Sequence, residues 1–133
     1  MSDQRIEMST HKDLIVWKKS IEFVTEVYKI TSTFPSEEKF GLVSQLRRAS
    51  VSIPSNIAEG AARSHDKEFI QFLSISLGSA SEVETQLIIC LNLKFFSDEI
   101  YNKLNNEIVE IRKMLSGLLK SKKSHNSSLI SHN

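Results

Sequence analysis

The sequence predicts an all-α protein, an antiparallel up-down four-helix bundle formed by a single domain. Three observations support this fold class. The chain of 133 residues is close to the ~150 residues of an average domain. Its 4 Gly and 2 Pro are few for a β protein, which needs a turn every ~8–12 residues. Apolar residues also recur in four stretches at steps of three and four, the period of a helix with one buried face.

Four apolar stripes define the expected helices in chain order. Asp13 is placed as the N-cap of the first helix, and Pro35 with the two acids after it suits the start of the second. Gly60 is expected to end the second helix and Ser97 to open the fourth. Short connections favour antiparallel neighbours. The stripes are Leu14, Trp17, Ile21, Val24 and Tyr28; Leu42, Val43, Leu46, Ala49, Ile53 and Ile57; Phe69, Leu73, Ser76, Ala80, Val83 and Leu87; and Tyr101, Leu104, Ile108, Ile111, Leu115 and Leu118.

The bundle is expected to span residues 11–119. Residues 1–10 and residues 120–133 show no sustained apolar period, which predicts a flexible N-terminus and a flexible basic C-terminal tail. Pro54 falls inside the second helix, where it lacks a backbone donor and clashes with the Ser50 carbonyl. A stop and restart is the alternative to a kink, but it leaves a fragment of only about two turns, so we prefer a kinked helix.

The second and third helices have more apolar surface than one buried face requires. On the second helix, small apolar residues and a Phe gather on an outer flank, about 120–160° from the core stripe. On the third, two isoleucines lie on the side expected to face water. Scattered surface apolar residues are common, but the excess on both helices favours a homo-oligomer, which closes into a ring if two different faces meet. The expected interface residues are Phe40, Val51, Ala58, Ala62, Ile75 and Ile89.

Glu84 lies at the centre of the apolar arc of the third helix. An unpaired buried carboxylate is costly, so it must find a partner or take up a proton. We expect a pair with Arg47 or Arg48, or with a core hydroxyl, and hypothesise that an arginine of the second helix makes Glu84 a specificity lock. A general-acid role is a weaker alternative, because no second titratable group has a defined relation to it.

No pattern typical of an enzyme is present. The sequence contains no G-x-x-x-x-G-K, G-x-G-x-x-G or H-E-x-x-H motif. No Glu precedes any of the 4 His by three positions, as a di-iron bundle requires. Cys90, the single cysteine, lies on the apolar arc, where a small hydrophobe is expected rather than a nucleophile. We therefore expect no enzymatic activity, no metal and no cofactor.

The expected compartment is the cytoplasm. One cysteine excludes an internal disulfide, which fits a reducing environment. No apolar run approaches the ~18 residues of a membrane span, and the first residues lack the apolar core of a signal peptide. No membrane partner is expected.

Charge gives a limited argument for nucleic-acid binding. The formal net charge is only +1, which predicts no strong global attraction to a polyanion. Positive charge favours the first two helices and the tail, and a ring would repeat each patch in every subunit. A simple solvated face is the alternative, and no aromatic platform for base stacking accompanies the cations. The candidate phosphate contacts are Lys18, Lys19, Arg47, Arg48 and Arg63.

The central stretch Gln45–Gly60, QLRRASVSIPSNIAEG, resembles the signature of the bacterial four-helix-bundle family of 23S rRNA intervening-sequence proteins. The DLIVWK run at residues 13–18 and segments within residues 68–87 are similar as well, so the resemblance covers about residues 12–119. It implies a small antiparallel bundle that assembles as a homopentamer without enzymatic activity. Residues that match the family by position, and for which it implies mainly architectural roles, are Arg47, Arg48, Pro54, Asn56, Glu59, Gly60 and Glu84.

This family is similar in turn to the accessory variability determinant of diversity-generating retroelements. The resemblance implies genes inside insertions in large-subunit rRNA genes or beside reverse transcriptases, and for the accessory relatives a basic surface that engages reverse transcriptase and nucleic acid. Two functions therefore remain open. One is a non-enzymatic, oligomeric nucleic-acid or ribonucleoprotein accessory. The other is a protein–protein interaction scaffold, such as a partner of a reverse transcriptase, that binds no nucleic acid.

Overall fold

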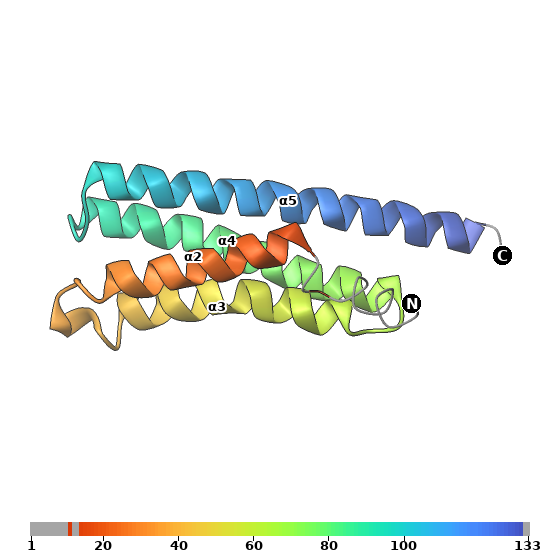
Figure 1. The fold of residues 1–133 in the computed structure, drawn as a ribbon, viewed down its shortest axis with the longest axis horizontal. Coiled ribbons are helices and arrows are strands. Elements are labelled where there is room, and N and C mark those ends of the chain that lie inside the picture. Colours follow the sequence, from red (N-terminus) through yellow and green to blue (C-terminus); the bar gives the residue numbers. More distant parts are fainter. Residues whose placement is uncertain (1–10, 12–13, 132–133) are drawn as a thin grey trace, which may run out of the picture.

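The computed structural model describes residue 11 and residues 14–131, with side chains described to residue 127. In this part of the chain there are four α-helices, one short 3-10 helix and no strand, which confirms the predicted all-α class. The helices lie side by side, and each runs back along the preceding one (Figure 1). The elements are α2 (Ile15–Thr31), η2 (Ser36–Glu38), α3 (Leu42–Ala61), α4 (Asp66–Asn92) and α5 (Asp98–Ser131).

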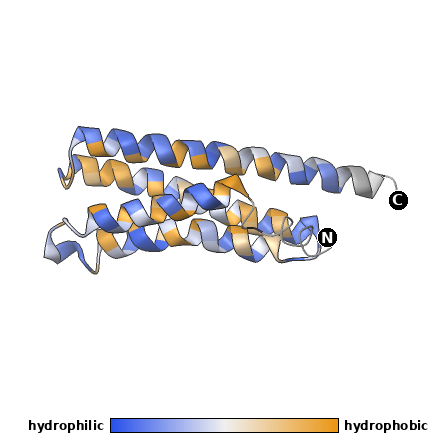
Figure 2. Ribbon diagram, viewed as in Figure 1, coloured by the Kyte–Doolittle hydropathy of each residue, from blue (hydrophilic) through white to orange (hydrophobic). Residues whose placement is uncertain are grey.

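A single apolar cluster to which all four helices contribute forms the core. α3, α4 and α5 bury most of the stripe predicted for each, and Ile53, Leu87 and Ile108 have no exposed surface. At one end an aromatic contact closes the cluster, where the ring of Phe34 lies 5.9 Å from that of Phe96. Hydrophobic residues recur along every helix and form a nearly continuous band at the C-terminal end of α4 (Figure 2). Removal of this surface from water is the main term that stabilises the bundle.

α2 buries a different face from the one predicted. The prediction was wrong because the buried face includes two hydroxyl residues, which look polar in the sequence. Ser20 Oγ donates to the Trp17 carbonyl at 2.8 Å and Thr31 Oγ1 donates to the Val27 carbonyl at 2.7 Å, so both hydroxyls are satisfied inside the core. Ile21, from the predicted stripe, is instead 40% exposed. The buried residues of α2 are Val16, Ser20, Phe23, Val27 and Thr31.

α3 begins later than predicted. Pro35 precedes the short η2 turn, and the Glu38 carboxylate then accepts a hydrogen bond at 3.3 Å from the N–H of Leu42, the first residue of α3. Phe40 therefore lies in the turn before α3 and not on the helix itself. Pro54 lies inside α3, so the helix continues through it without a stop and restart. The kink at this position stays a prediction.

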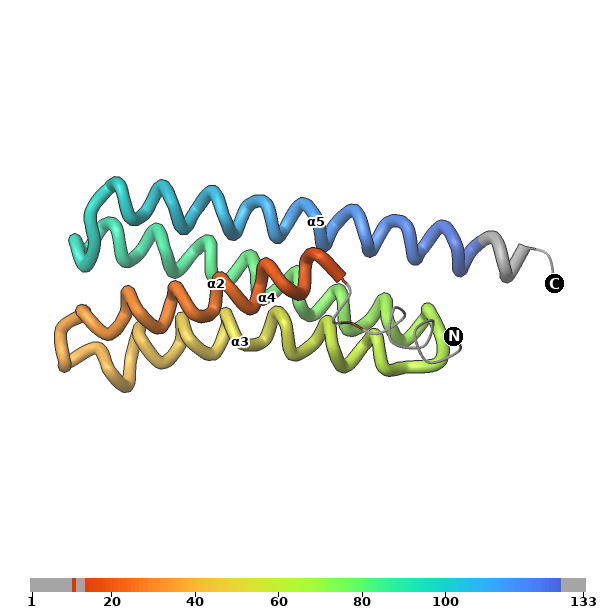
Figure 3. Tube along the Cα trace, viewed as in Figure 1, coloured from red at the N-terminus to blue at the C-terminus, as the bar shows by residue number. Residues whose placement is uncertain are grey.

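α5 is longer than the sequence analysis expected. It begins after Ser97, whose Oγ accepts a hydrogen bond from the Ile100 N–H at 3.2 Å, as expected of the residue that opens this helix. The segment expected to form a tail is instead helical through Ser131. Figure 3 shows the C-terminal end of α5 projecting beyond α3 and α4. Asp13 and residues 1–10, for which a helix cap and a flexible N-terminus were predicted, lie outside the described residues.

Candidate nucleic-acid interface

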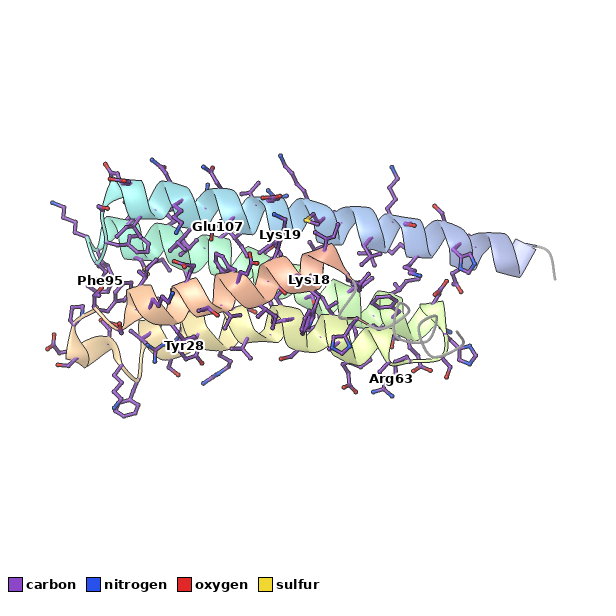
Figure 4. The ribbon with its side chains drawn as sticks, viewed as in Figure 1. Lys18, Lys19, Tyr28, Arg63, Phe95 and Glu107 are labelled. Atoms are coloured by element: carbon purple, nitrogen blue, oxygen red, sulfur yellow. The ribbon has the colours of Figure 1, made fainter. Side chains whose placement is uncertain are left out.

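α2 presents two of the predicted phosphate contacts near its first turns (Figure 4). Lys18 is exposed and makes no ion pair with any described residue. The Lys19 ammonium, in contrast, lies 3.1 Å from the Glu110 carboxylate of α5. Because the pair is exposed, its contribution to stability is small, but it offsets the positive charge at this point of the surface.

Arg47 on α3 is engaged by α2. Its Nε donates a hydrogen bond to Thr31 Oγ1 at 2.9 Å, and one Nη donates to the Tyr28 carbonyl at 3.3 Å. The guanidinium also lies over the Tyr28 ring, 4.4 Å from its centroid. These contacts satisfy the last turn of α2 and add a cation–π interaction. The side chain therefore ties α3 to α2 and is not a free phosphate contact.

The remaining two predicted phosphate contacts, Arg63 and Arg48, differ in whether their charge is paired. Arg63 lies 2.6 Å from a Glu59 oxygen and 3.8 Å from a Glu68 oxygen, so two carboxylates offset its charge. Arg48 is exposed and lines an open pocket of about 350 Å³ between α3 and α4, together with Glu82 and other polar residues. Among the predicted cations, Lys18 and Arg48 alone have neither an ion pair nor a hydrogen bond to a described residue.

The five predicted cations do not form one patch. Tyr28, the residue over which Arg47 stacks, and Arg63 lie toward opposite ends of the bundle (Figure 4). Lys18 and Lys19 come from α2, at a third position. The geometry therefore offers separate single charges and not a continuous track for a phosphate backbone.

The architectural motif of α3 makes close contacts with α4. Asn56 Nδ2 donates to the Ser52 carbonyl at 2.8 Å, and Ser79 Oγ of α4 donates to Ser52 Oγ at 2.8 Å. At Gly60 an added Cβ would lie 2.7 Å from Phe72 Cβ, so a side chain at this position cannot fit without a shift of α4. The motif thus fixes the approach of α3 to α4.

Glu84 pairs with a residue of α5, and the predicted arginine partner on the second helix was wrong. Arg112 Nε donates to the Glu84 carboxylate at 2.8 Å. The side chain of Glu84 is 23% exposed and that of Arg112 is 36% exposed, so the pair lies at the edge of the core. Glu84 therefore pairs across the α4–α5 contact, while Arg47 of α3 donates its hydrogen bonds to α2.

The predicted interface residues lie on the outside of the single chain. Phe40 is 89% exposed and Ile75 is 50% exposed, while Ala58 is half-buried. Isolated exposed apolar residues are normal on a soluble protein and are informative only where they form a contiguous patch. The large apolar side chains on the surface are Ile15, Ile21, Tyr28, Phe40, Val51, Ile75, Ile88, Ile89 and Leu93.

A basic groove that the sequence analysis did not single out lies between α4 and the second half of α5. Lys120 and Lys123 line it with serines of α5 and with Leu77 of α4, around an open volume of about 570 Å³. Neither lysine makes an ion pair with a described residue. The sequence did show that residues 120–133 are positively charged. It did not show that these residues form a helix, which is what places Lys120 and Lys123 on one side.

An acidic groove lies on the other side of α5, against α2. Its lining includes Glu22, Glu26, Glu107 and Glu110, around about 350 Å³. Figure 4 shows Glu107 and Lys19 on the facing helices. Burial raises the pKa of the Glu107 carboxyl above its usual value, because desolvation outweighs the attraction of nearby lysines.

The single cysteine of the chain lies in the core. The Cys90 thiol is buried, and burial raises its pKa to about 12, so it is protonated at neutral pH. Among the described residues, no group of three or more His, Cys, Asp or Glu side chains is placed to hold a metal ion. None of the described helices combines the length and apolar character needed to cross a bilayer.

This fold and its α3 motif define a class of small helical-bundle proteins. The chain belongs to the 23S rRNA-intervening sequence protein family, which matches residues 12–117. It is similar to a crystal structure from Bacteroides thetaiotaomicron VPI-5482, a protein of unknown function from the S23 ribosomal protein family, with a TM-score of 0.76. The two chains are 32% identical, and the match covers 82% of this chain and 98% of the other. No curated protein matches the chain.

Proposed function

We propose that the protein is a non-enzymatic, oligomeric accessory of nucleic acid or ribonucleoprotein, linked to rRNA intervening sequences and located in the cytoplasm. The observation that carries this proposal is its membership, over residues 12–117, of the 23S rRNA-intervening sequence protein family. The buried, protonated Cys90 supports a role without nucleophilic chemistry. We therefore propose that the protein acts through binding and assembly at its surface.

The assembled form we propose is a homopentamer of antiparallel up-down bundles, with α3 kinked at Pro54. The apolar residues on the surface of the single chain support an oligomer, because burial of such residues is favourable at ~25 cal/mol per Å². Val51 lies on α3 and Ala62 is the C-cap of that helix, while Ile75 and Ile89 lie on α4. A contact that joins two different faces generates a ring when the rotation closes.

Absolute mass from light scattering tests the assembly. We expect a mass several times the 15.1 kDa of one chain, stable over micromolar dilution. Val51→Asp should lower the mass toward that of one chain, because it places a charge at the proposed contact. Asn102→Asp adds the same charge to an exposed position of α5 and should leave the mass unchanged. A wild-type mass of 15.1 kDa at all concentrations would contradict the oligomer.

Salt-titrated binding of RNA and DNA tests the nucleic-acid function. We expect binding at ~50 mM salt that weakens steeply as salt rises, because phosphate contacts release counterions. Lack of affinity at ~50 mM salt, or an affinity insensitive to salt, would end the nucleic-acid proposal.

A second candidate function is a protein-binding scaffold, such as a partner of a reverse transcriptase. The observation that favours it is the engagement of Lys19, Arg47 and Arg63 by other residues of the chain. Capture of partners from the native host, with and without nuclease treatment, separates the two functions. Partners that survive nuclease support the scaffold, and partners lost with nuclease support the nucleic-acid accessory.

A further inference from the structure

Charge is segregated along α5. From Asp98 to Glu110 the helix has four acidic residues and one lysine, whereas from residue 111 onward the sequence has five Lys or Arg and no Asp or Glu. Cations stabilise a helix C-terminus through its dipole, but that effect is confined to the last turn. Lys123 lies more than two turns before Ser131, so the dipole does not account for this distribution.

Two of these five cations are used inside the bundle and three are free. Arg112 pairs with Glu84, and Lys122 lies 3.8 Å from Asp66, so the two α4 carboxylates that face this half of α5 are already engaged. Lys113, Lys120 and Lys123 make no ion pair with any described residue, and all three are exposed. No acid lines the groove beside Lys120 and Lys123, whereas Lys113 lines the next pocket along α5 together with Glu110, which pairs with Lys19.

The three free lysines lie on one side of α5. Steps of seven and three residues place them within ~80° of one another around a helix. Lys113 and Lys123 are ten residues apart, which corresponds to about 15 Å along the axis. That length matches several nucleotides of a strand at ~3.4 Å per nucleotide. A row of charges of this length suits a row of phosphates better than a single anion.

The groove beside this row has the lining that a phosphate backbone requires. Lys120 and Lys123 are accompanied by the hydroxyls of Ser116, Ser124 and Ser127, and no acidic residue is part of the lining. Lysine ammonium and serine hydroxyl groups both donate hydrogen bonds to phosphate oxygens. The C-terminal end of α5 projects beyond α3 and α4, so a long polymer can follow this side of the helix (Figure 3).

We infer that the α4–α5 groove lined by Lys120 and Lys123, together with Lys113 on the same side of α5 outside the groove, binds the phosphodiester backbone of a nucleic-acid strand. The inference rests on the proposed function and gives it a site different from the cations predicted on α2 and α3. The sequence from residue 111 onward contains no Phe, Tyr or Trp on which bases could stack, so we expect binding that is independent of sequence. The same lack of aromatic anchors disfavours an acidic protein segment as the ligand, because protein interfaces depend on such anchors.

Fluorescence anisotropy with a labelled 20-nucleotide oligouridylate tests this site in the full chain. We compare the wild type with Lys113→Gln/Lys120→Gln/Lys123→Gln. The control is Lys29→Gln/Lys39→Gln/Lys94→Gln, which removes the same charge from exposed lysines elsewhere. Circular dichroism confirms that both variants keep their helix content.

The expected result is a tenfold or greater loss of affinity in the groove variant at ~100 mM salt, and little loss in the control. The slope of log affinity against log salt should fall by about 2, because each lost phosphate contact on a single strand removes about 0.7. Oligodeoxythymidylate of the same length should bind with similar affinity, since the lining contacts phosphate and not sugar.

Each failure has a distinct meaning. If wild type and groove variant bind the strand equally well, the groove inference is overturned and the proposed function stands. If the wild type binds no strand at ~50 mM salt, both are overturned. Binding of polyglutamate that depends on the same lysines, without binding of either oligonucleotide, would show that the groove accepts an acidic protein segment and would overturn the nucleic-acid assignment.

Discussion

The two halves of α5 line grooves of opposite character. The first half faces α2 across a groove with four glutamates, and the lysines there, Lys19 and Lys103, are paired with Glu110 and Glu26. The second half faces α4 across a groove with free lysines, serines and no acid. Glu110 and Lys120 are ten residues, or about 15 Å, apart along the axis, which is more than the ~8 Å over which salt screens charge at physiological ionic strength, while Lys113 lies only three residues after Glu110. A net charge of +1 is therefore no argument against a local polyanion site.

The two halves also differ in packing. α2 has 17 residues and α5 has 34, so α2 can cover only part of α5. In the first half, α5 packs between α2 and α4, with Leu104 and Ile108 in the core. In the second half it packs against α4, for example where Lys122 lies over the Phe69 ring. The first half is therefore held from two sides, while the second buries Ile111 and Leu115 in the core and leaves more of its circumference exposed.

Truncation of core residues in the two halves should give the largest difference. We expect Ile108→Ala to lower the free energy of unfolding by about 2–5 kcal/mol, because it leaves a cavity where no surface is exposed. Leu119→Ala should cost about 2 kcal/mol or less, since Leu119 is near the edge at 8% exposure and its surroundings can relax. Urea denaturation measures both. Equal losses would show that the second half is as tightly integrated as the first.

Glycine replacement in the second half should stabilise the protein. Gly117 lies in the interior of α5, and an added Cβ would meet no atom within 4 Å. Gly117→Ala should therefore raise the free energy of unfolding by about 0.5–1 kcal/mol through better helix propensity.

Gly60→Ala is the matched contrast for this change, because the same substitution in α3 meets Phe72 Cβ at 2.7 Å. We expect it to lower the free energy of unfolding by about 1–3 kcal/mol through overpacking. A loss of stability in Gly117→Ala would mean that this half of α5 contacts something in the assembled protein.

The sequence predicted the fold wherever buried residues are apolar. The stripes of α3, α4 and α5 consist mainly of aliphatic residues, so period alone identified their buried faces. The buried face of α2 was not predicted, because Ser20 and Thr31 are buried with their hydroxyls hydrogen-bonded to carbonyls of the helix backbone. A hydrophobicity scale counts both residues as polar. The helical structure of residues 120–131 was not predicted, because serines and lysines interrupt the apolar period there.

The candidate site depended on contacts between helices, which a single sequence does not specify. Arg47 looks like a free cation in the sequence, yet its bonds to Thr31 and Tyr28 exist only when α2 lies beside it. Lys120 and Lys123 look like part of a loose tail, and only the helix aligns them on one side. The sequence gives the number of cationic side chains. Which of them lack an ion pair or hydrogen bond within the chain can be seen only when the helices are packed together.

Loss of the Glu84–Arg112 pair should have a smaller effect. This pair lies where the acidic half of α5 changes to the basic half. Glu84→Gln should lower the free energy of unfolding by about 0.5–1 kcal/mol at low salt, because the pair is partly exposed. Thermal unfolding at ~50 mM and ~1 M salt measures it, and the difference from wild type should shrink at high salt. An unchanged melting temperature at both would show that the pair contributes nothing.

The smallest expected effect concerns Glu107 in the acidic groove. Its pKa in the folded protein is raised above that of an unfolded Glu, near ~4.3, chiefly by burial. The folded state therefore binds the proton more tightly, so stability falls as pH rises through the interval between the two pKa values. Glu107→Gln removes this loss and should raise the free energy of unfolding at pH 7 by a few tenths of a kcal/mol, since solvent screens the half-buried group.

The pH dependence separates this effect from a general gain in packing. Below pH ~4 the carboxyl of Glu107 is protonated in both states, so the variant and the wild type should unfold with nearly equal free energies. An advantage of Glu107→Gln that is as large at pH ~3.5 as at pH 7 would contradict the electrostatic account and point to the shape of the groove instead.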